Sequence, residues 1–241
     1  MQGELEIMDK YIFDVDGTLT PSRGLIDLEF KMFFNTFCLT HDVYLVTGSD
    51  RAKTVEQLSE PTYNLAKRVY NCSGSDVYEG RINVHRSDWI LPRSCSHWLE
   101  DKLEESAFEL RTGLHIEARP GMVNFSIVGR KATPEQRQQY VKYDKKHNER
   151  VNIAALFNLE FQELKAVVGG ETGIDIFPKG YDKSQIIRDF DPTDTLHFFG
   201  DAMETTGNDY PLKKVIIDND LGMCYNVNSW KDTRELLNEE K

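Results

Sequence analysis

The sequence lacks long hydrophobic runs and closely spaced cysteines. No apolar stretch approaches the roughly 20 residues that a membrane-spanning helix needs. The opening residues, MQGELEIMDK, also lack the basic start and the apolar stretch of a signal peptide. The four cysteines are scattered with no C-x-x-C pair, a pattern that fits neither a zinc site nor a disulfide framework. We therefore expect a cytoplasmic protein with reduced cysteines and no membrane partner.

Positive charge is also in short supply. The 241 residues include 29 Lys and Arg against 40 Asp and Glu, which gives a formal net charge of −11. This balance is a poor match to a nucleic-acid backbone, so we expect no nucleic-acid partner. A few basic side chains gathered in a cleft would still suffice to bind a phosphorylated small molecule. The length allows one large domain, or a core domain with a moderate insertion.

The first part of the chain alternates predicted strands and helices. Residues 11–15 and 43–47 are short apolar runs typical of buried strands. Residues 25–38 carry apolar side chains at helical spacing, and a second helix is predicted over residues 51–58. Such alternation predicts a parallel sheet with its functional loops at the carboxyl ends of the strands.

The middle of the chain has a different pattern. The pattern predicts a helix over residues 98–108, followed by a hairpin of two strands (114–118 and 122–128) around Pro120-Gly121. It then predicts a long helical region with one break over residues 133–161, and two more strands on either side of Gly169-Gly170. The rest of the chain predicts a helix over residues 183–188, strands over residues 195–199, 215–217 and 223–227, and a final helix over residues 229–237. The predicted fold is α/β, with a Rossmann-like parallel-sheet core (residues 1–84 and 182–241) and an inserted α+β cap (residues 85–181).

Two aspartates follow the first predicted strand, in the sequence Asp14-Val15-Asp16-Gly17-Thr18. Alternate residues of a strand point to the same side, so Asp14 and Asp16 aim two carboxyl groups at one place. One carboxylate can attack phosphorus and form an acyl phosphate while its neighbour protonates the departing oxygen. An ordinary acidic turn after a strand would explain the Asp-x-Asp-Gly motif alone.

Three later elements favour the catalytic interpretation. Thr47, with Ser49 as a second candidate, ends the next strand and offers a hydroxyl group to phosphate oxygens. Lys183 can neutralise a phosphoryl group. Two acidic turns, Gly200-Asp201 and Gly207-Asn208-Asp209, add hard oxygen ligands. Each element alone is typical of a protein surface, but together they predict a phosphoryl-transfer site.

This order of elements resembles the haloacid dehalogenase (HAD) superfamily of phosphotransferases. The resemblance implies Asp14 as the nucleophile, Asp16 as the general acid and base, and Thr47 and Lys183 as phosphate ligands. It also implies a Mg²⁺ ion held by acidic residues, namely Asp14, Asp16 through its backbone carbonyl, Asp209 and the neighbouring Asp201. An oxygen-rich site without His or Cys prefers Mg²⁺ to zinc, which agrees with this expectation.

A closer resemblance, over nearly the whole chain, is to the eukaryotic-type phosphomannomutases, which carry a type IIB cap. Four segments carry it: Phe13 to Pro21, Gly121-Met122-Val123-Asn124 with Val128-Gly129-Arg130, Phe177 to Lys183, and His197 to Gly200 with Gly207-Asn208-Asp209. The resemblance assigns Arg23 to the core side of the substrate cleft. It assigns the remaining substrate contacts to the cap: Arg111, Arg119 and Arg130 to the phosphate that is not transferred, and Asn124 and Asp175 to sugar hydroxyls.

The activity implied by this resemblance is the interconversion of mannose 6-phosphate and mannose 1-phosphate for GDP-mannose biosynthesis. A hexose 1,6-bisphosphate is the implied activator, and a homodimer through the cap is the implied assembly. A mutase must hold one phosphate while the other reacts, so it needs two anion sites. Arginine suits the second one because its planar fork pairs bidentately with phosphate and keeps its charge. Read without the resemblance, the same arginines could be solvated surface residues.

A capped sugar-phosphate phosphatase, in which water takes the phosphoryl group from Asp14, is the alternative. Three positions depart from the mutase pattern: Gly173 replaces a usual serine, while Thr47 and Asp201 stand where mutases commonly have glycine and asparagine. Residues 212–222 differ from that pattern as well. A binding protein on an inactive phosphatase fold would lack the nucleophile or a metal ligand, and this sequence retains both.

Overall fold

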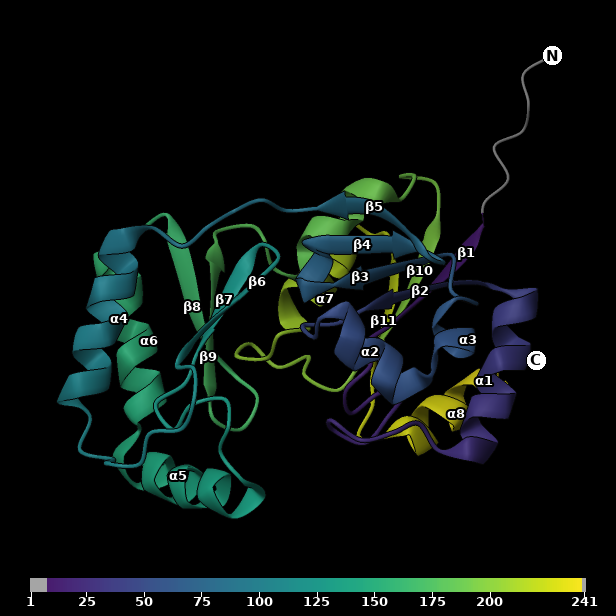
Figure 1. Ribbon diagram of the computed structural model, residues 1–241. Coiled ribbons are helices and arrows are strands. Elements are labelled where there is room, and N and C mark those ends of the chain that lie inside the picture. The colour runs from purple at the N-terminus through teal and green to yellow at the C-terminus, as the bar shows by residue number, and fades with distance from the viewer. Residues whose placement is uncertain (1–7, 240–241) are drawn as a thin grey trace. The chain divides into compact units, whose positions relative to one another are not determined.

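The computed structural model describes residues 8–239. Contacts within the chain define two compact units, one made of the chain up to Arg86 and from Gly180 onward, and one made of Ser87–Lys179 (Figure 1). The second unit is therefore an insertion into the first. Among the described residues, no helix combines the length and the apolar character needed to cross a membrane.

Within residues 8–239, the first unit is built on a seven-stranded sheet. Its order is β11-β10-β1-β2-β3-β4-β5. The strands are β1 (Asp9–Phe13), β2 (Asp42–Val46), β3 (Arg68–Asn71), β4 (Asp76–Glu79), β5 (Ile82–Arg86), β10 (Thr195–Gly200) and β11 (Gly222–Asn226). Neighbours from β11 to β3 pair in parallel, whereas β4 and β5 extend the sheet in antiparallel fashion. The predicted α/β fold with a parallel-sheet core is confirmed.

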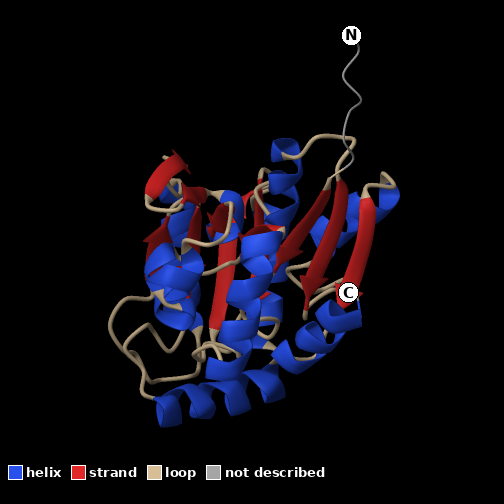
Figure 2. Cartoon of the chain, turned by 90° about the vertical axis from the view of Figure 1, so that its right-hand side faces the viewer, coloured by secondary structure: helices blue, strands red, loops and turns tan. Residues whose placement is uncertain are grey.

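Helices cover both faces of this sheet, as Figure 2 shows. They are α1 (Leu28–Thr40), α2 (Arg51–Leu58), α3 (Glu60–Tyr63), α7 (Tyr210–Asp218) and α8 (Trp230–Glu239), with 3₁₀ turns η1 (Cys72–Gly74) and η2 (Lys183–Asp189). Alternate residues of β1 serve the two layers. Phe13 packs in one cluster with Phe34 of α1, and Ile12 packs in another with Leu212 of α7. A strand buried on both faces reads as a continuous apolar run, which is why β1 was predictable.

Helix α1 begins three residues later than the apolar pattern predicts. The carboxylate of Asp27 accepts hydrogen bonds from the backbone N–H groups of Glu29 and Phe30, at 3.0 Å each. An aspartate in this position satisfies amide groups that have no partner inside the helix. The cap, rather than the first apolar residue, therefore sets the start of the helix.

The prediction of a strand over residues 215–217 is wrong. These residues belong to α7, which begins at Tyr210 with Pro211 in its first turn. The β-branched run Val215-Ile216-Ile217 suggests a strand when it is read alone. Leu212 and Ile216 are both fully buried, and their spacing of four residues is that of one helix face. Burial of this face, together with the proline in the first turn, stabilises a helix here instead of a strand.

Strands β3, β4 and β5 were not predicted. Each has only four or five residues, and every residue of β5 is exposed. An exposed edge strand shows no alternation of buried and exposed positions, so its sequence carries little signal. Pairing with β4, and not burial, holds β5 in place.

The second unit contains a four-stranded antiparallel sheet in the order β6-β7-β9-β8. Its elements are α4 (Arg93–Glu105), β6 (Ile116–Arg119), β7 (Met122–Phe125), α5 (Pro134–His147), α6 (Glu149–Glu160), β8 (Leu164–Gly169) and β9 (Gly173–Pro178). The hairpin at Pro120-Gly121 is confirmed, and the predicted break between the helices is Asn148, at a left-handed φ of 52°.

One face of this second sheet is apolar and the other is polar. Phe125 of β7 and Ile176 of β9 pack with Leu99 of α4 and Phe157 of α6 in one buried cluster. Because successive residues of a strand alternate between faces, Asn124 and Asp175 lie on the opposite face. The polar side chains predicted to bind substrate are therefore grouped away from the helices α4 and α6.

An ion pair between two central strands gives a testable contribution to stability. Lys10 Nζ lies 2.7 Å from a carboxylate oxygen of Asp42, its cross-strand neighbour, and Lys67 Nζ lies 3.3 Å from the other oxygen. The Lys10 hydrogen bond holds the pKa of Asp42 below its ordinary value, against the opposing effect of burial. We expect Asp42→Asn to lower the free energy of unfolding by about 1–2 kcal/mol at neutral pH.

The pH dependence of this effect has a definite sign. The folded-state pKa of Asp42 is lowered, so its contribution is complete above the ordinary aspartate pKa of about 3.9 and disappears as the pH falls through the folded-state value. Urea unfolding of the parent and the variant should therefore converge at low pH. Asp218→Asn, which breaks an exposed pair with Lys214, is the control and should change stability little. A difference that persists at the lowest pH would contradict the ion-pair explanation.

Candidate active site

The predicted nucleophile lies at the carboxyl end of the central strand. Asp14 directly follows β1, and its backbone N–H donates a hydrogen bond of 2.9 Å to the carbonyl of Phe199 in β10. Its side chain is almost completely buried, with a residue exposure of 3%. The parallel strands on either side of β1 end at the same edge of the sheet, so side chains from three strands can meet there.

Three carboxylates gather at this edge. Asp14, Asp201 and Asp209 each offer an oxygen atom, and these oxygens lie within 4.8 Å of one another. Asp201 follows β10 and is exposed, whereas Asp209 immediately precedes α7 and is fully buried. Gly200 makes room for this arrangement, because a Cβ atom there would lie only 2.6 Å from an oxygen of Asp209. The structure thus brings together three of the four predicted metal-binding residues through their side chains.

Lys183 is the cation of this cluster. It is fully buried at the start of η2, and its Nζ lies 2.5 Å from Asp14 Oδ1 and 2.6 Å from Asp209 Oδ1. Burial by itself would lower the pKa of Lys183, but the charges of the two carboxylates raise it above the usual value. The ammonium group therefore stays protonated and binds the nucleophile directly.

The cluster carries more negative than positive charge. Burial raises the pKa of Asp14, the Lys183 ammonium lowers it, and the charge of Asp209 raises it again, with a net result well above the ordinary value. Three carboxylates face one ammonium group, so the ionised cluster has an excess of two negative charges. Because Asp14 and Asp209 are buried, this excess is costly unless further positive charge is present.

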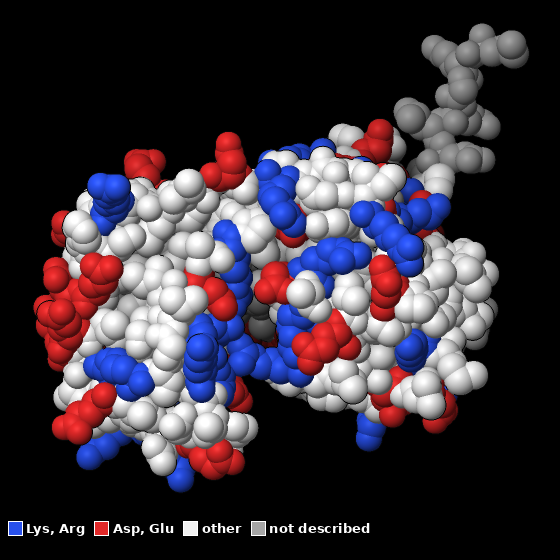
Figure 3. Space-filling view, viewed as in Figure 1, with Lys and Arg blue, Asp and Glu red and all other residues white. Residues whose placement is uncertain are grey.

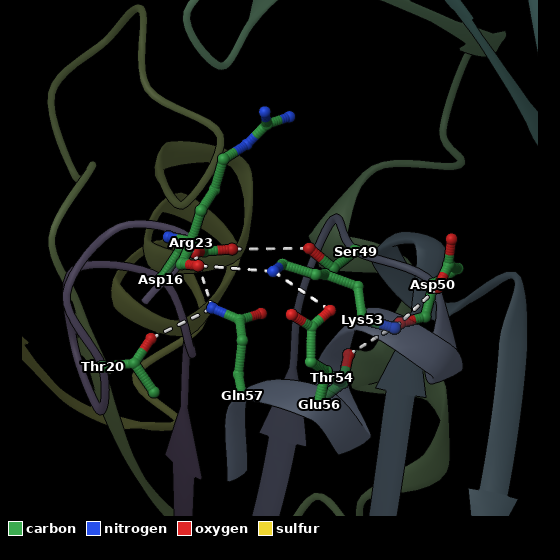
Figure 4. A network of polar contacts seen from close by, with 9 residues as sticks. All are labelled: Asp16, Thr20, Arg23, Ser49, Asp50, Lys53, Thr54, Glu56 and Gln57. Atoms are coloured by element: carbon green, nitrogen blue, oxygen red, sulfur yellow. Dashed lines mark hydrogen bonds and ion pairs between the residues drawn. The ribbon is translucent and has the colours of Figure 1, made fainter. Parts of the chain in front are cut away.

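The carboxylate of Asp16 is held by a separate set of contacts (Figure 4). Asp16 Oδ1 accepts hydrogen bonds from the backbone N–H of Arg23 at 2.5 Å and from Gln57 Nε2 at 2.9 Å. Ser49 Oγ lies 3.4 Å from Asp16 Oδ2. The Arg23 guanidinium group points away from this network in Figure 4. These donors hold the carboxylate of Asp16, the predicted general acid and base, in one orientation.

Gln57 was missed by the sequence analysis. It lies on α2 with only 1% of its surface exposed, and its Nε2 donates to both Asp16 and Thr20 Oγ1, the latter at 3.1 Å. Its Oε1 has no hydrogen-bond partner among the described residues. The available signal was a polar residue on the apolar face of a predicted helix, next to Leu58.

Thr47 and Ser49 follow β2, which neighbours β1. Thr47 is buried, and its Oγ1 accepts a hydrogen bond of 3.1 Å from the backbone N–H of Ser49. Its own hydroxyl proton remains available to a phosphate oxygen. Both predicted phosphate-binding hydroxyls therefore stand at the edge of the sheet that carries Asp14.

A row of polar residues crosses the sheet of the second unit. Glu117, Asn124 and Asp175 are cross-strand neighbours on β6, β7 and β9. Asn124 Nδ2 donates to Asp175 Oδ1 at 2.6 Å, and Arg130 Nη1 donates to Asn124 Oδ1 at 3.4 Å. A Cβ atom at Gly173 would lie 2.5 Å from Asn124 Nδ2. The glycine that departs from the mutase pattern therefore leaves space that Asn124 occupies.

Glu117 joins the two predicted phosphate-binding arginines. Its Oε2 lies 2.9 Å from Arg119 Nε, 2.5 Å from Arg119 Nη2 and 3.1 Å from Arg130 Nε. Burial raises the pKa of Glu117, but the two arginines outweigh this effect and hold the pKa below its ordinary value. Sequence analysis did not single out Glu117, since only the cross-strand register places it beside Asn124.

Arg111 is placed differently from the other predicted arginines. Its guanidinium group donates hydrogen bonds to four backbone carbonyls, including that of Leu103 at 2.7 Å. These contacts tie the segment after α4 to the chain that leads toward β6. The side chain stabilises a loop and, among the described residues, makes no hydrogen bond or ion pair with Glu117, Asn124 or Asp175.

Solved structures similar to this chain share its fold at low sequence identity. A haloacid dehalogenase-like hydrolase from Bacteroides thetaiotaomicron has a TM-score of 0.58 at 12% identity, covering 95% of this chain and 91% of that one. The IMP-nucleotidase of Plasmodium falciparum has a TM-score of 0.61 at 14% identity, covering 97% of this chain and 68% of that one. The chain therefore has the fold of haloacid dehalogenase-like proteins.

Sequence comparison identifies the family. A family model of eukaryotic phosphomannomutase matches residues 30–240. The phosphomannomutase of Glycine max is 33% identical over 216 residues, covering 83% of this chain and 85% of the relative. That of Saccharomyces cerevisiae is 31% identical over 244 residues, covering 95% and 92%. The chain belongs to the eukaryotic phosphomannomutase family, whose enzymes are intramolecular phosphotransferases.

Proposed function

We propose that this protein interconverts mannose 6-phosphate and mannose 1-phosphate through a phosphate ester on Asp14. The observation that carries this proposal is the buried contact of Asp14 with Lys183 beside two further carboxylates, in a member of this family. The unit that contains Asp14 is the proposed catalytic core. The inserted unit, residues 87–179, is the proposed cap.

The reaction divides into two transfers that share the same residues. A carboxylate oxygen of Asp14 forms a bond to phosphorus while the bond from phosphorus to the sugar oxygen breaks, and Asp16 protonates that oxygen. In the second transfer, Asp16 accepts the proton of the attacking sugar hydroxyl, whose oxygen takes the phosphoryl group and frees Asp14. Lys183 and Thr47 bind the phosphoryl oxygens. A hexose 1,6-bisphosphate starts the cycle by phosphorylating Asp14.

The acidic cluster fits a Mg²⁺ ion. Its donors are all oxygen atoms, and its excess of two negative charges equals the charge of the ion. We propose Asp14, Asp209, Asp201 and the backbone carbonyl of Asp16 as the residues that would hold it. When bound, Mg²⁺ supplies positive charge to the phosphoryl oxygens.

The polar face of the second sheet suits the part of the substrate that does not react. We propose that Arg119 and Arg130 bind the phosphate that is not transferred, and that Asn124 and Asp175 hydrogen-bond sugar hydroxyls. Arg23 of the core would add a further contact to the substrate. The hydrogen bonds from Arg130 to Asn124 and from Asn124 to Asp175 support this assignment, because they hold a guanidinium group beside an amide and a carboxylate.

One experiment separates the proposed mutase from a phosphatase. The protein is incubated with mannose 1-phosphate, Mg²⁺ and a catalytic amount of hexose 1,6-bisphosphate, while mannose 6-phosphate and free phosphate are both measured. The proposal expects mannose 6-phosphate to dominate. Free phosphate as the main product would show that water wins the competition for the phosphoryl group on Asp14, and would favour a sugar-phosphate phosphatase.

Replacing one cap arginine should affect the mannose phosphates, whose non-transferred phosphate is proposed to bind there, but not a small ester that reacts at Asp14 alone. We expect Arg119→Ala to lower kcat/KM for the mannose phosphates by about ten- to a hundredfold, because a charge-assisted contact of about 1.5–3 kcal/mol is lost. Hydrolysis of p-nitrophenyl phosphate should change little, since the core residues are intact. Equal losses on both substrates would mean that Arg119 supports folding or the core site instead.

Two further assignments follow from the chain as a whole. We also propose that the protein is cytoplasmic, where its four cysteines, all of them free and within the described residues, would stay reduced. There the product would supply GDP-mannose biosynthesis. A homodimer through the cap is proposed as well, and α6 offers exposed apolar residues for it, namely Val151, Leu156 and Leu159.

A further inference from the structure

Glu117 places a negative charge between the two arginines that are proposed to bind the second phosphate. A single oxygen, Oε2, contacts Nε and Nη2 of Arg119 and also Nε of Arg130. Glu117 and Arg119 are two residues apart on β6, so both side chains leave the same face of the sheet. One carboxylate oxygen therefore lies within ion-pair distance of both guanidinium groups: it is hydrogen-bonded to Arg119, whereas Arg130 Nε, 3.1 Å away, has no hydrogen-bond partner among the described residues.

The surroundings make this charge effective. The side chains of Arg119 and Arg130 are only 14% and 21% exposed, and that of Glu117 is 31% exposed. Interactions among partly buried charges are less weakened by water and salt than those on an open surface. Within this group of three side chains, Glu117 reduces the summed charge from +2 to +1, and Asp175, beside Asn124 on the same face, adds further negative charge.

We propose that Glu117 competes with the non-transferred phosphate for Arg119 and Arg130, and so weakens the binding of that phosphate. This inference rests on the proposed mutase function. Glu117 Oε2 already accepts two hydrogen bonds from Arg119 and forms an ion pair with Arg130, so an arriving phosphate would compete for those hydrogen bonds and be repelled by the carboxylate. Binding of the phosphate must therefore rearrange the existing contacts between Glu117 and the two arginines.

Weaker binding is useful in this reaction. The bisphosphate formed when a sugar monophosphate takes the phosphoryl group from Asp14 must release its distal phosphate before its other end can approach Asp14. Binding energy that is equally strong before and during the reaction lowers KM without raising kcat, and it slows release. When the Glu117 carboxylate pairs with both guanidinium groups again, it favours release of the distal phosphate in each catalytic cycle. Glu117 would thus be a positioning residue that adjusts affinity, without contact with the transferred phosphoryl group.

The contrary role for Glu117 is purely structural, in which it orients the arginines and thereby strengthens phosphate binding. The two roles predict opposite changes in KM when the charge is removed. Glu117→Gln is the discriminating variant, because the amide keeps the shape and one acceptor oxygen but carries no charge. Glu117→Ala removes both the charge and the acceptor.

We expect Glu117→Gln to lower KM for mannose 1-phosphate by about three- to tenfold at low ionic strength, with kcat no higher than that of the parent. The difference should shrink as salt is added, since screening weakens an electrostatic effect. Hydrolysis of p-nitrophenyl phosphate should stay unchanged. The matched control is Glu104→Gln, which removes an exposed carboxylate from the acidic surface of α4 (Figure 3) and should leave every parameter unchanged.

The outcomes separate this inference from the proposed function. If Glu117→Gln raises KM or leaves it unchanged while Arg119→Ala raises KM, the arginines bind phosphate but Glu117 does not compete, and the inference is overturned. If neither variant changes KM, the proposed phosphate site itself is wrong. Thermal unfolding of each variant distinguishes a change in affinity from a loss of folded protein.

Discussion

Asp14→Asn should abolish turnover of mannose phosphates and prevent phosphorylation of the protein. The amide is a far weaker nucleophile than the carboxylate, so a loss of at least about a thousandfold in kcat is expected. Labelling with a hexose 1,6-bisphosphate that carries radioactive phosphate, followed by acid quenching, measures the phosphorylated protein directly. The parent should retain label and the variant should not.

The fold of this variant can be checked independently. Lys183 keeps its contact with Asp209 at 2.6 Å when Asp14 is neutralised, so the buried ammonium group retains a charged partner. Circular dichroism and thermal unfolding should therefore remain close to those of the parent. Activity within about tenfold of the parent, in a folded variant, would exclude Asp14 as the nucleophile.

Asp16→Asn should have the second-largest effect. The change preserves the shape of the side chain but removes proton transfer, so kcat should fall by about a hundred- to ten-thousandfold while the protein stays folded. The loss should be smaller for p-nitrophenyl phosphate, whose leaving group needs little protonation. Both rates are measured on the same preparation and compared as a ratio.

The contacts of Asp16 sharpen this test. Its Oδ1 accepts hydrogen bonds from Arg23 N–H and Gln57 Nε2, and an asparagine oxygen can accept both. Loss of activity in the variant would thus reflect the missing proton rather than a displaced loop. Normal turnover of mannose 1-phosphate would require a different acid and would remove Asp16 from the mechanism.

Much of the core site could be predicted because it depends on strand ends. Asp14 follows a strand that is apolar on both faces, and this pattern is visible in the sequence. Thr47 follows its parallel neighbour β2, so the placement of both residues at one edge needs only the sheet topology. Lys183 was found by its motif, since the contact with Asp14 joins residues 169 positions apart.

Other features depend on tertiary structure. Gln57 matters only because α2 turns it toward Asp16, and Glu117 only because β6 pairs with β7 in a particular register. Residues 215–217 form a helix although their branched side chains suggest a strand, because Leu212 and Ile216 are buried on one helix face. Short-range patterns carry no information about such pairings.

The position of β1 between β2 and β10 has a consequence for biosynthesis. β10 begins at Thr195, after the whole inserted unit, and Lys183 also follows that unit in the chain. As the ribosome adds residues from the N-terminus, β1 acquires one sheet neighbour early and the other only when most of the chain has emerged. Pairing β1 with β10 closes a long loop, and the entropy cost of this closure is offset only once the contacts between the two strands form. The nucleophile therefore receives its cationic partner late in synthesis, and a nascent chain that stops within the insertion carries Asp14 without Lys183.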